Sequence, residues 1–75
     1  MKNRIKCGSC IETNDGKLIV RGRGNAMYTA FVEEYVYDDD TGDVVYARDL
    51  TLTFYEIAKR MKEMDGRNHQ VVFDD

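Results

Sequence analysis

The sequence predicts an α+β fold, an antiparallel sheet of four to five strands with one helix packed on one face. Two observations indicate the strands: apolar and β-branched stretches recur along the chain, and polar segments with hairpin-forming residues divide them. A third observation indicates the helix: one segment near the C-terminal end has apolar residues at helical spacing. The predicted order is ββββαβ, which is typical of two-layer domains. The 75 residues are expected to form one small domain, residues 1–75.

The first hairpin is predicted from residues 4–13 and 17–21. Asn14, Asp15 and Gly16 separate the two stretches, and these residue types tolerate the backbone angles of tight turns. Residues 22–25, with two glycines, then predict a break in the strand.

A second, longer hairpin is predicted from residues 27–37 and 44–48, with the polar turn 38–43 between them. Both alternating sets of residues in 27–37 are largely apolar, whereas a strand with one wet face alternates polar and apolar residues. This strand spans about 36 Å, and the helix covers about 18 Å. We therefore expect the uncovered apolar face to be an interface, most simply in a homodimer. A bend near Glu33 and Glu34, or tyrosines at a half-wet edge, are the alternatives.

The helix is predicted to begin at Thr53, because Thr53 and Glu56 have the spacing of a capping box. Leu52 and Ile57 flank this cap as a hydrophobic staple. Gly66 is predicted to end the helix, since glycine favours the left-handed cap. The apolar stripe comprises Phe54, Ile57, Ala58, Met61 and Met64, and Lys59, Arg60, Lys62 and Glu63 are expected to face away. A final strand is predicted over residues 70–73.

Composition and charge narrow the class of protein. The net charge is −3, but residues 1–24 contain six basic and two acidic residues, and residues 25–50 contain one basic and seven acidic residues. This asymmetry indicates either a polarised surface or neighbouring strands that neutralise each other. No apolar run approaches the ~20 residues that cross a bilayer. We expect no membrane association, no signal peptide and a cytoplasmic location.

Cys7 and Cys10 form a C-x-x-C motif. A structural zinc site needs four ligands, so a zinc ion here would have to be shared across a dimer. A redox pair needs a stabilised thiolate, typically at a helix N-terminus, and the residues after Cys10 predict strand and turn instead. The third interpretation, small half-buried strand residues without a cofactor, is the one we favour.

Six basic residues could gather along one edge of the first hairpin and bind a nucleic acid, with aromatic neighbours as a stacking platform. They are Lys2, Arg4, Lys6, Lys17, Arg21 and Arg23. The acidic net charge argues against this alternative.

The sequence contains no pattern that indicates an enzyme. His69 is the one imidazole, and no nucleophile, base and orienting group can be assembled around it. Gly22 and Gly24 lack the remainder of a phosphate-binding loop. The acidic turn lacks the ligand spacing of a calcium loop.

We therefore expect a non-enzymatic protein-binding module, an inhibitor or adaptor of a larger complex, such as one that handles nucleic acid. Aromatic residues anchor interfaces, and acidic residues attract a basic partner. In size and style the chain resembles small accessory proteins of phages and mobile elements. Nucleic-acid binding and self-assembly as a structural protein are the alternatives. The expected partner-binding residues are Tyr28, Glu33, Glu34, Tyr35, Tyr37, Asp38, Asp39 and Asp40.

Overall fold

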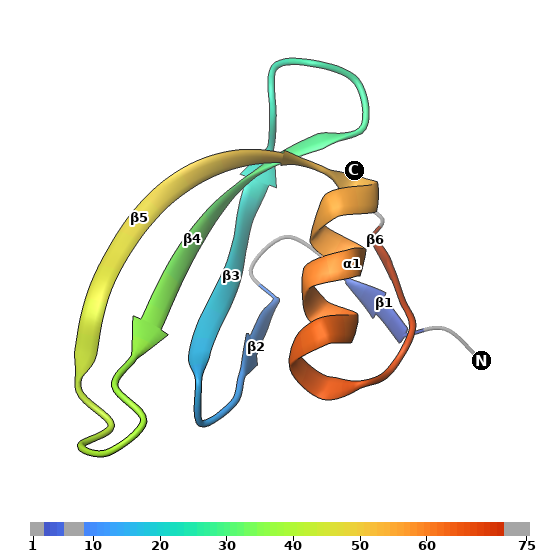
Figure 1. Ribbon diagram of the computed structural model, residues 1–75. Helices are drawn as coiled ribbons and strands as arrows, with labels where there is room; N and C mark the ends of the chain where they lie inside the picture. Colours follow the sequence, from blue (N-terminus) through green and yellow to red (C-terminus); the bar gives the residue numbers. More distant parts are fainter. Residues whose placement is uncertain (1–2, 6–8, 72–75) are drawn as a thin grey trace.

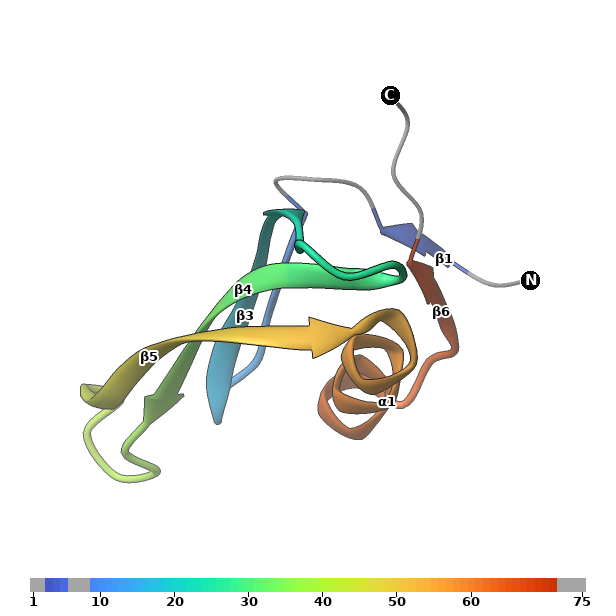
Figure 2. The same ribbon diagram turned by 90° about the horizontal axis from the view of Figure 1, so that it is seen from above.

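The computed structural model describes residues 3–5 and 9–71, with side chains for residues 9–71. A curved antiparallel sheet in the order β2-β3-β4-β5 carries one helix on its concave side, and β1 and β6 form a separate parallel pair (Figures 1 and 2). This arrangement confirms the predicted α+β class. The elements are β1 Asn3–Ile5, β2 Cys10–Glu12, β3 Gly16–Arg23, β4 Thr29–Tyr37, β5 Val44–Thr53, α1 Phe54–Asp65 and β6 His69–Val71.

The two ends of the chain differ from the predicted strands. The stretch predicted as one strand over 4–13 contains two strands, β1 and β2, which belong to different sheets. The predicted last strand begins one residue earlier, and it pairs with β1, with Asn3 opposite His69. After α1, the chain continues beside the helix and does not return to the edge of the four-stranded sheet. Strand β6 therefore pairs with β1 next to the helix (Figure 2).

Both predicted hairpins are confirmed. In the first, the Thr13 N–H donates to the Gly16 carbonyl at 2.9 Å. Gly16 starts β3, where a Cβ atom would lie 2.3 Å from the carbonyl oxygen of Tyr35. Only glycine lets the two backbones approach this closely. In the second, the Asp38 N–H donates to the Asp43 carbonyl at 2.8 Å.

Two register shifts contribute to the curvature of the sheet. In β3, Arg21 is an extra residue between Val20 and Gly22, and bulges of this kind bend a strand and increase its twist. After the bulge, β3 stays paired with β4 through Arg23. The strand therefore ends after Arg23, and the break predicted over residues 22–25 begins later than expected. In β5, Val45 is the extra residue, because Val36 pairs with Tyr46 and Tyr37 pairs with Val44. Neither shift lies at Glu33 or Glu34.

Helix α1 begins and ends as the sequence predicts. The Thr53 hydroxyl accepts the Glu56 N–H at 3.1 Å. Gly66 has a φ of +76° and donates its N–H to the Lys62 carbonyl at 2.7 Å. Arg60 is a correction: it does not face away but reaches the sheet, where it forms an ion pair with Glu34. Its position follows the bend of β4 towards the helix.

The hydrophobic core lies between the concave face of the sheet and α1. The fully buried side chains are Leu18 and Val20 from β3, Ala30 and Val32 from β4, and Ile57 and Met61 from α1, with Val71 of β6 closing one side. Ile11, Leu50, Leu52, Phe54, Ala58 and Met64 pack around them. The convex face of the sheet and the edge of β5 receive no cover from the described helix.

Candidate functional site

A compact polar and aromatic cluster occupies the convex face of β3 and β4. The Lys17 ammonium lies 4.7 Å from the centroid of the Tyr35 ring. Arg21 Nε donates to Glu33 Oε1 at 2.9 Å, and the Tyr35 hydroxyl donates to Glu33 Oε2 at 3.1 Å. The Arg21 hydrogen bond lowers the pKa of Glu33, and the Glu33 carboxylate raises the pKa of Tyr35. Basic and acidic residues that the sequence assigned to different partners thus neutralise each other here.

Tyr37 lies near the end of the same face and is half-buried. Its hydroxyl donates to Glu12 Oε2 on β2. This hydrogen bond, which favours the neutral phenol, raises the pKa of Tyr37 to about 12. Tyr35 and Tyr37 are therefore held by their own sheet, and their hydroxyl groups are already occupied.

Tyr28 does not belong to this face. It precedes β4 in the loop after β3, with a φ of +59° and 68% of its surface exposed. Its ring packs edge to face against Phe54, with centroids 6.0 Å apart. Its carbonyl accepts the Phe54 N–H at 2.8 Å. Tyr28 thus lies at the opposite end of β4 from Tyr37.

The acidic turn of the second hairpin is exposed at the end of β4 and β5. Asp38 Oδ1 accepts the N–H groups of Asp40 and Thr41, at 2.8 and 3.0 Å. These backbone hydrogen bonds lower the pKa of Asp38. Asp38 therefore shapes the turn, and the exposed Asp39 and Asp40 give it its negative charge.

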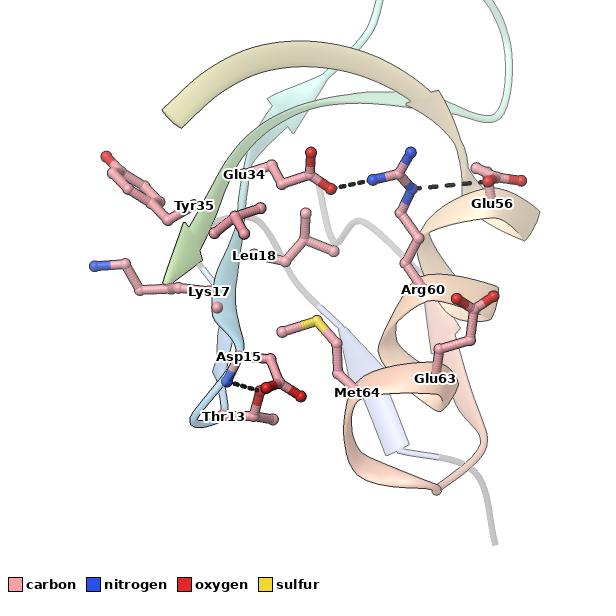
Figure 3. Close-up of a pocket in the computed structure, with 12 residues that line it drawn as sticks. Thr13, Asp15, Lys17, Leu18, Glu34, Tyr35, Glu56, Arg60, Glu63 and Met64 are labelled. Carbon is pink, nitrogen blue, oxygen red and sulfur yellow. Dashed lines mark hydrogen bonds and ion pairs between the residues drawn. The ribbon is translucent and has the colours of Figure 1, made fainter. Parts of the chain in front are cut away.

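Glu34, an expected partner-binding residue, faces the helix and does not share a surface with Glu33. Its carboxylate binds Arg48 Nε of β5 at 2.7 Å and Arg60 of α1 (Figure 3). Arg60 Nε also lies 3.7 Å from Glu56 Oε1. Only 15% of the Glu34 side chain is exposed. Through these ion pairs Glu34 links β4 to β5 and to α1. The sequence did not predict this structural role.

A cleft of about 320 Å³ opens between α1 and the strands β3 and β4 (Figure 3). Leu18 and Met64 line its apolar part, and Asp15 and Glu63 stand at its entrance, while Lys17 and Tyr35 point away from the helix. The lining contains no histidine or cysteine. The Tyr35 hydroxyl donates to the Glu33 carboxylate on the convex face, away from the cleft.

His69 is buried beside the end of α1. Its Nε2 lies 2.9 Å from Asp65 Oδ2, and its Nδ1 has no hydrogen-bond partner in the described part of the chain. Burial opposes ionisation of Asp65, but hydrogen bonds from the Arg67 N–H and from His69 outweigh it and lower the pKa of Asp65. The pair anchors the segment that leads from α1 into β6.

The predicted nucleic-acid residues are divided among different parts of the fold. Lys17 and Arg21 belong to the neutralised convex cluster, and Arg23 is exposed at the end of β3. Arg4 lies in β1, outside the four-stranded sheet. Lys2 and Lys6 lie outside the described residues.

Cys10 lies on β2, opposite Ile19, as the favoured interpretation of a strand cysteine expects, but it is exposed and not half-buried, because β2 is an edge strand of the sheet. Cys7, the other residue of the alternative zinc site, lies outside the described residues. No group of three or more histidine, cysteine, aspartate and glutamate residues able to hold a metal occurs within residues 9–71.

The open edge of β5 is a feature that the sequence analysis did not single out. β5 has ten residues and is the last strand of the sheet, so one side of its backbone pairs with β4 and the other pairs with no described strand. Val44, Val45 and Tyr46 are 54%, 60% and 45% exposed. Three successive apolar residues after an acidic turn were the signal in the sequence.

No helix among the described residues is long and apolar enough to span a membrane. Comparisons with protein-family models, with characterised proteins and with solved structures return no match.

Proposed function

We propose that this protein is a non-enzymatic binding protein that receives a strand of another polypeptide at the open edge of β5. The observation that carries the proposal is the edge itself, ten residues long, with Val44, Val45 and Tyr46 exposed at one end. An edge of this kind supplies a row of unpaired N–H and C=O groups, and in known complexes an extended segment adds to such a row.

The residues of β5 favour this use. Among the devices that protect exposed edges, β5 lacks lysine and proline, and it has two charged residues, Arg48 and Asp49, and the bulge at Val45. Val44, Val45 and Tyr46 are all about half exposed at this end of the edge. Their burial by an added strand would contribute about 25 cal/mol for each Å² of apolar surface removed from water.

The acidic turn beside the edge points to the chemistry of the partner. Asp39 and Asp40 are exposed and Asp43 follows them, directly before Val44. A negative surface next to an apolar one guides a partner with basic residues and orients it. An inhibitor or adaptor that covers the basic surface of a nucleic-acid-handling complex fits this combination.

The proposal is tested by retention of host proteins on the immobilised wild type and on Ala47→Lys, which places a charge in the middle of the edge. Tyr55→Lys is the matched control, because Tyr55 is 77% exposed and lies in the first turn of α1, beyond the end of β5. We expect a defined set of proteins to bind wild type and Tyr55→Lys but not Ala47→Lys. Equal retention by all three proteins would contradict binding at β5.

A further inference from the structure

We propose that the strand received by β5 is β5 of a second copy of this chain, paired antiparallel with Ala47 on the two-fold axis. The two four-stranded sheets then form one continuous sheet. This inference rests on the proposed use of the β5 edge and names the partner at that edge.

Symmetry restricts how two copies of β5 can pair. Residues directly opposite in an antiparallel pair lie on the same face of the sheet. A two-fold axis perpendicular to the sheet therefore passes between one residue and the same residue of the second copy. Each possible register is defined by the residue at its centre.

Charge excludes the two central registers. A register centred on Arg48 places two guanidinium groups opposite each other, and one centred on Asp49 does the same with two carboxylates. Like charges directly opposite destabilise a strand pair. A register centred on Leu50 avoids this, but its paired residues, 47–53, leave the exposed apolar residues of β5 uncovered.

The register centred on Ala47 pairs residues 46–48 of both copies regularly over about 10 Å and reaches the bulge at Val45 on either side. It places Tyr46 opposite Arg48 of the second copy, and the bulge turns Val44 to the convex face, on which Asp49 of the second copy also lies. Tyr46 and Arg48 already interact within one chain, with the guanidinium carbon 5.7 Å from the ring centroid. The ring and the cation can make the same contact across the interface, because both residues pair with β4 positions that face α1.

The small side chain at the centre suits this register. Ala47 lies opposite Tyr35 of β4, on the convex face, and is exposed. Two alanines meet at the axis without a steric conflict, and Tyr46 before them is covered by Arg48 of the second copy. The edge of β5 is thus self-complementary at Tyr46, Ala47 and Arg48.

The test introduces a charge at residue 47, which lies on the two-fold axis. Ala47→Lys and Ala47→Asp each place like charges opposite each other, so we expect each variant alone to raise the dimer dissociation constant about fivefold or more, measured by sedimentation velocity. An equimolar mixture of the two variants should restore association, because the introduced lysine of one chain then faces the introduced aspartate of the other across the axis. Tyr55→Lys should dimerise as the wild type does.

The wild type gives an independent measurement. Amide hydrogen exchange within residues 46–48 should slow as the protein concentration rises through the range in which sedimentation detects dimers. A wild type that is monomeric at all concentrations, or a mixture that fails to restore association, would overturn the inference. If the wild type is monomeric but retains host proteins that Ala47→Lys does not retain, the second copy is ruled out as the partner. Binding of another protein at β5 would then remain supported. Equal retention of host proteins would count against the proposed function itself.

Discussion

Replacement of Ile57 by alanine tests whether α1 holds the curved sheet together. Ile57 is completely buried in the first turn of the helix, among the sheet residues Leu18, Val20 and Val32 of the core cluster. Alanine removes three carbon atoms from the centre of this cluster. Strands β3 and β4 cannot move into the space that the lost carbon atoms leave, because they are paired with each other along most of their length.

The expected loss is a large part of the total stability. Ile→Ala substitutions in cores cost 2–5 kcal/mol, and we expect about 3 kcal/mol here. A chain of this length has a free energy of unfolding of about 4–11 kcal/mol. At roughly 4–8 °C for each kcal/mol in a domain of this size, Tm should fall by about 12–24 °C.

Urea unfolding followed by circular dichroism measures this change. Lys59→Ala, on the exposed side of the same helix, is the control and should change the free energy of unfolding by less than about 0.5 kcal/mol. A similar, small change in both variants would refute the reasoning, because the helix would then contribute little to the folding of the sheet.

Three further predictions concern the ends of α1 and the convex face. Thr53→Ala should destabilise the fold by about 1 kcal/mol in thermal unfolding through loss of the N-cap, and Thr53→Ser should retain stability; equal loss in both would contradict the capping role. Gly66→Ala should lower the free energy of unfolding in urea by about 1 kcal/mol. The φ of Gly66 is +76° and an added Cβ would meet no atom within 4 Å, so the cost comes from backbone strain alone, and Gly66→Asn should cost less. Tyr37→Phe should remove the ionisation near pH 12 from the absorbance titration of tyrosine, and persistence of that step would reassign it. Because the folded-state pKa of Tyr37 lies above its ordinary value of 10, the hydrogen bond to Glu12 stabilises the fold fully below pH 10, and this contribution is lost as the pH rises towards 12.

The candidate site was only partly predictable, because its residues are defined by pairing and not by local pattern. The tyrosines of residues 27–37 suggested one aromatic surface, but Tyr28 lies in a loop and Tyr35 and Tyr37 donate hydrogen bonds to Glu33 and Glu12. The opposite orientations of Glu33 and Glu34 follow from the strand period alone. The arginines that bind Glu34 come from β5 and α1, and no local rule identifies them.

The sequence by itself determined the local elements, namely the two hairpins and the limits of the helix, because turn residues, the Thr53 cap and Gly66 act through their immediate neighbours. Only the tertiary structure decided which strand ends the sheet, where the bulges at Arg21 and Val45 bend it, and which apolar residues stay exposed. The physical reason is the distance along the chain over which the deciding contacts act. Caps and turns depend on contacts within a few residues, whereas strand order and burial depend on partners far apart in the chain, and these made β5 the open edge.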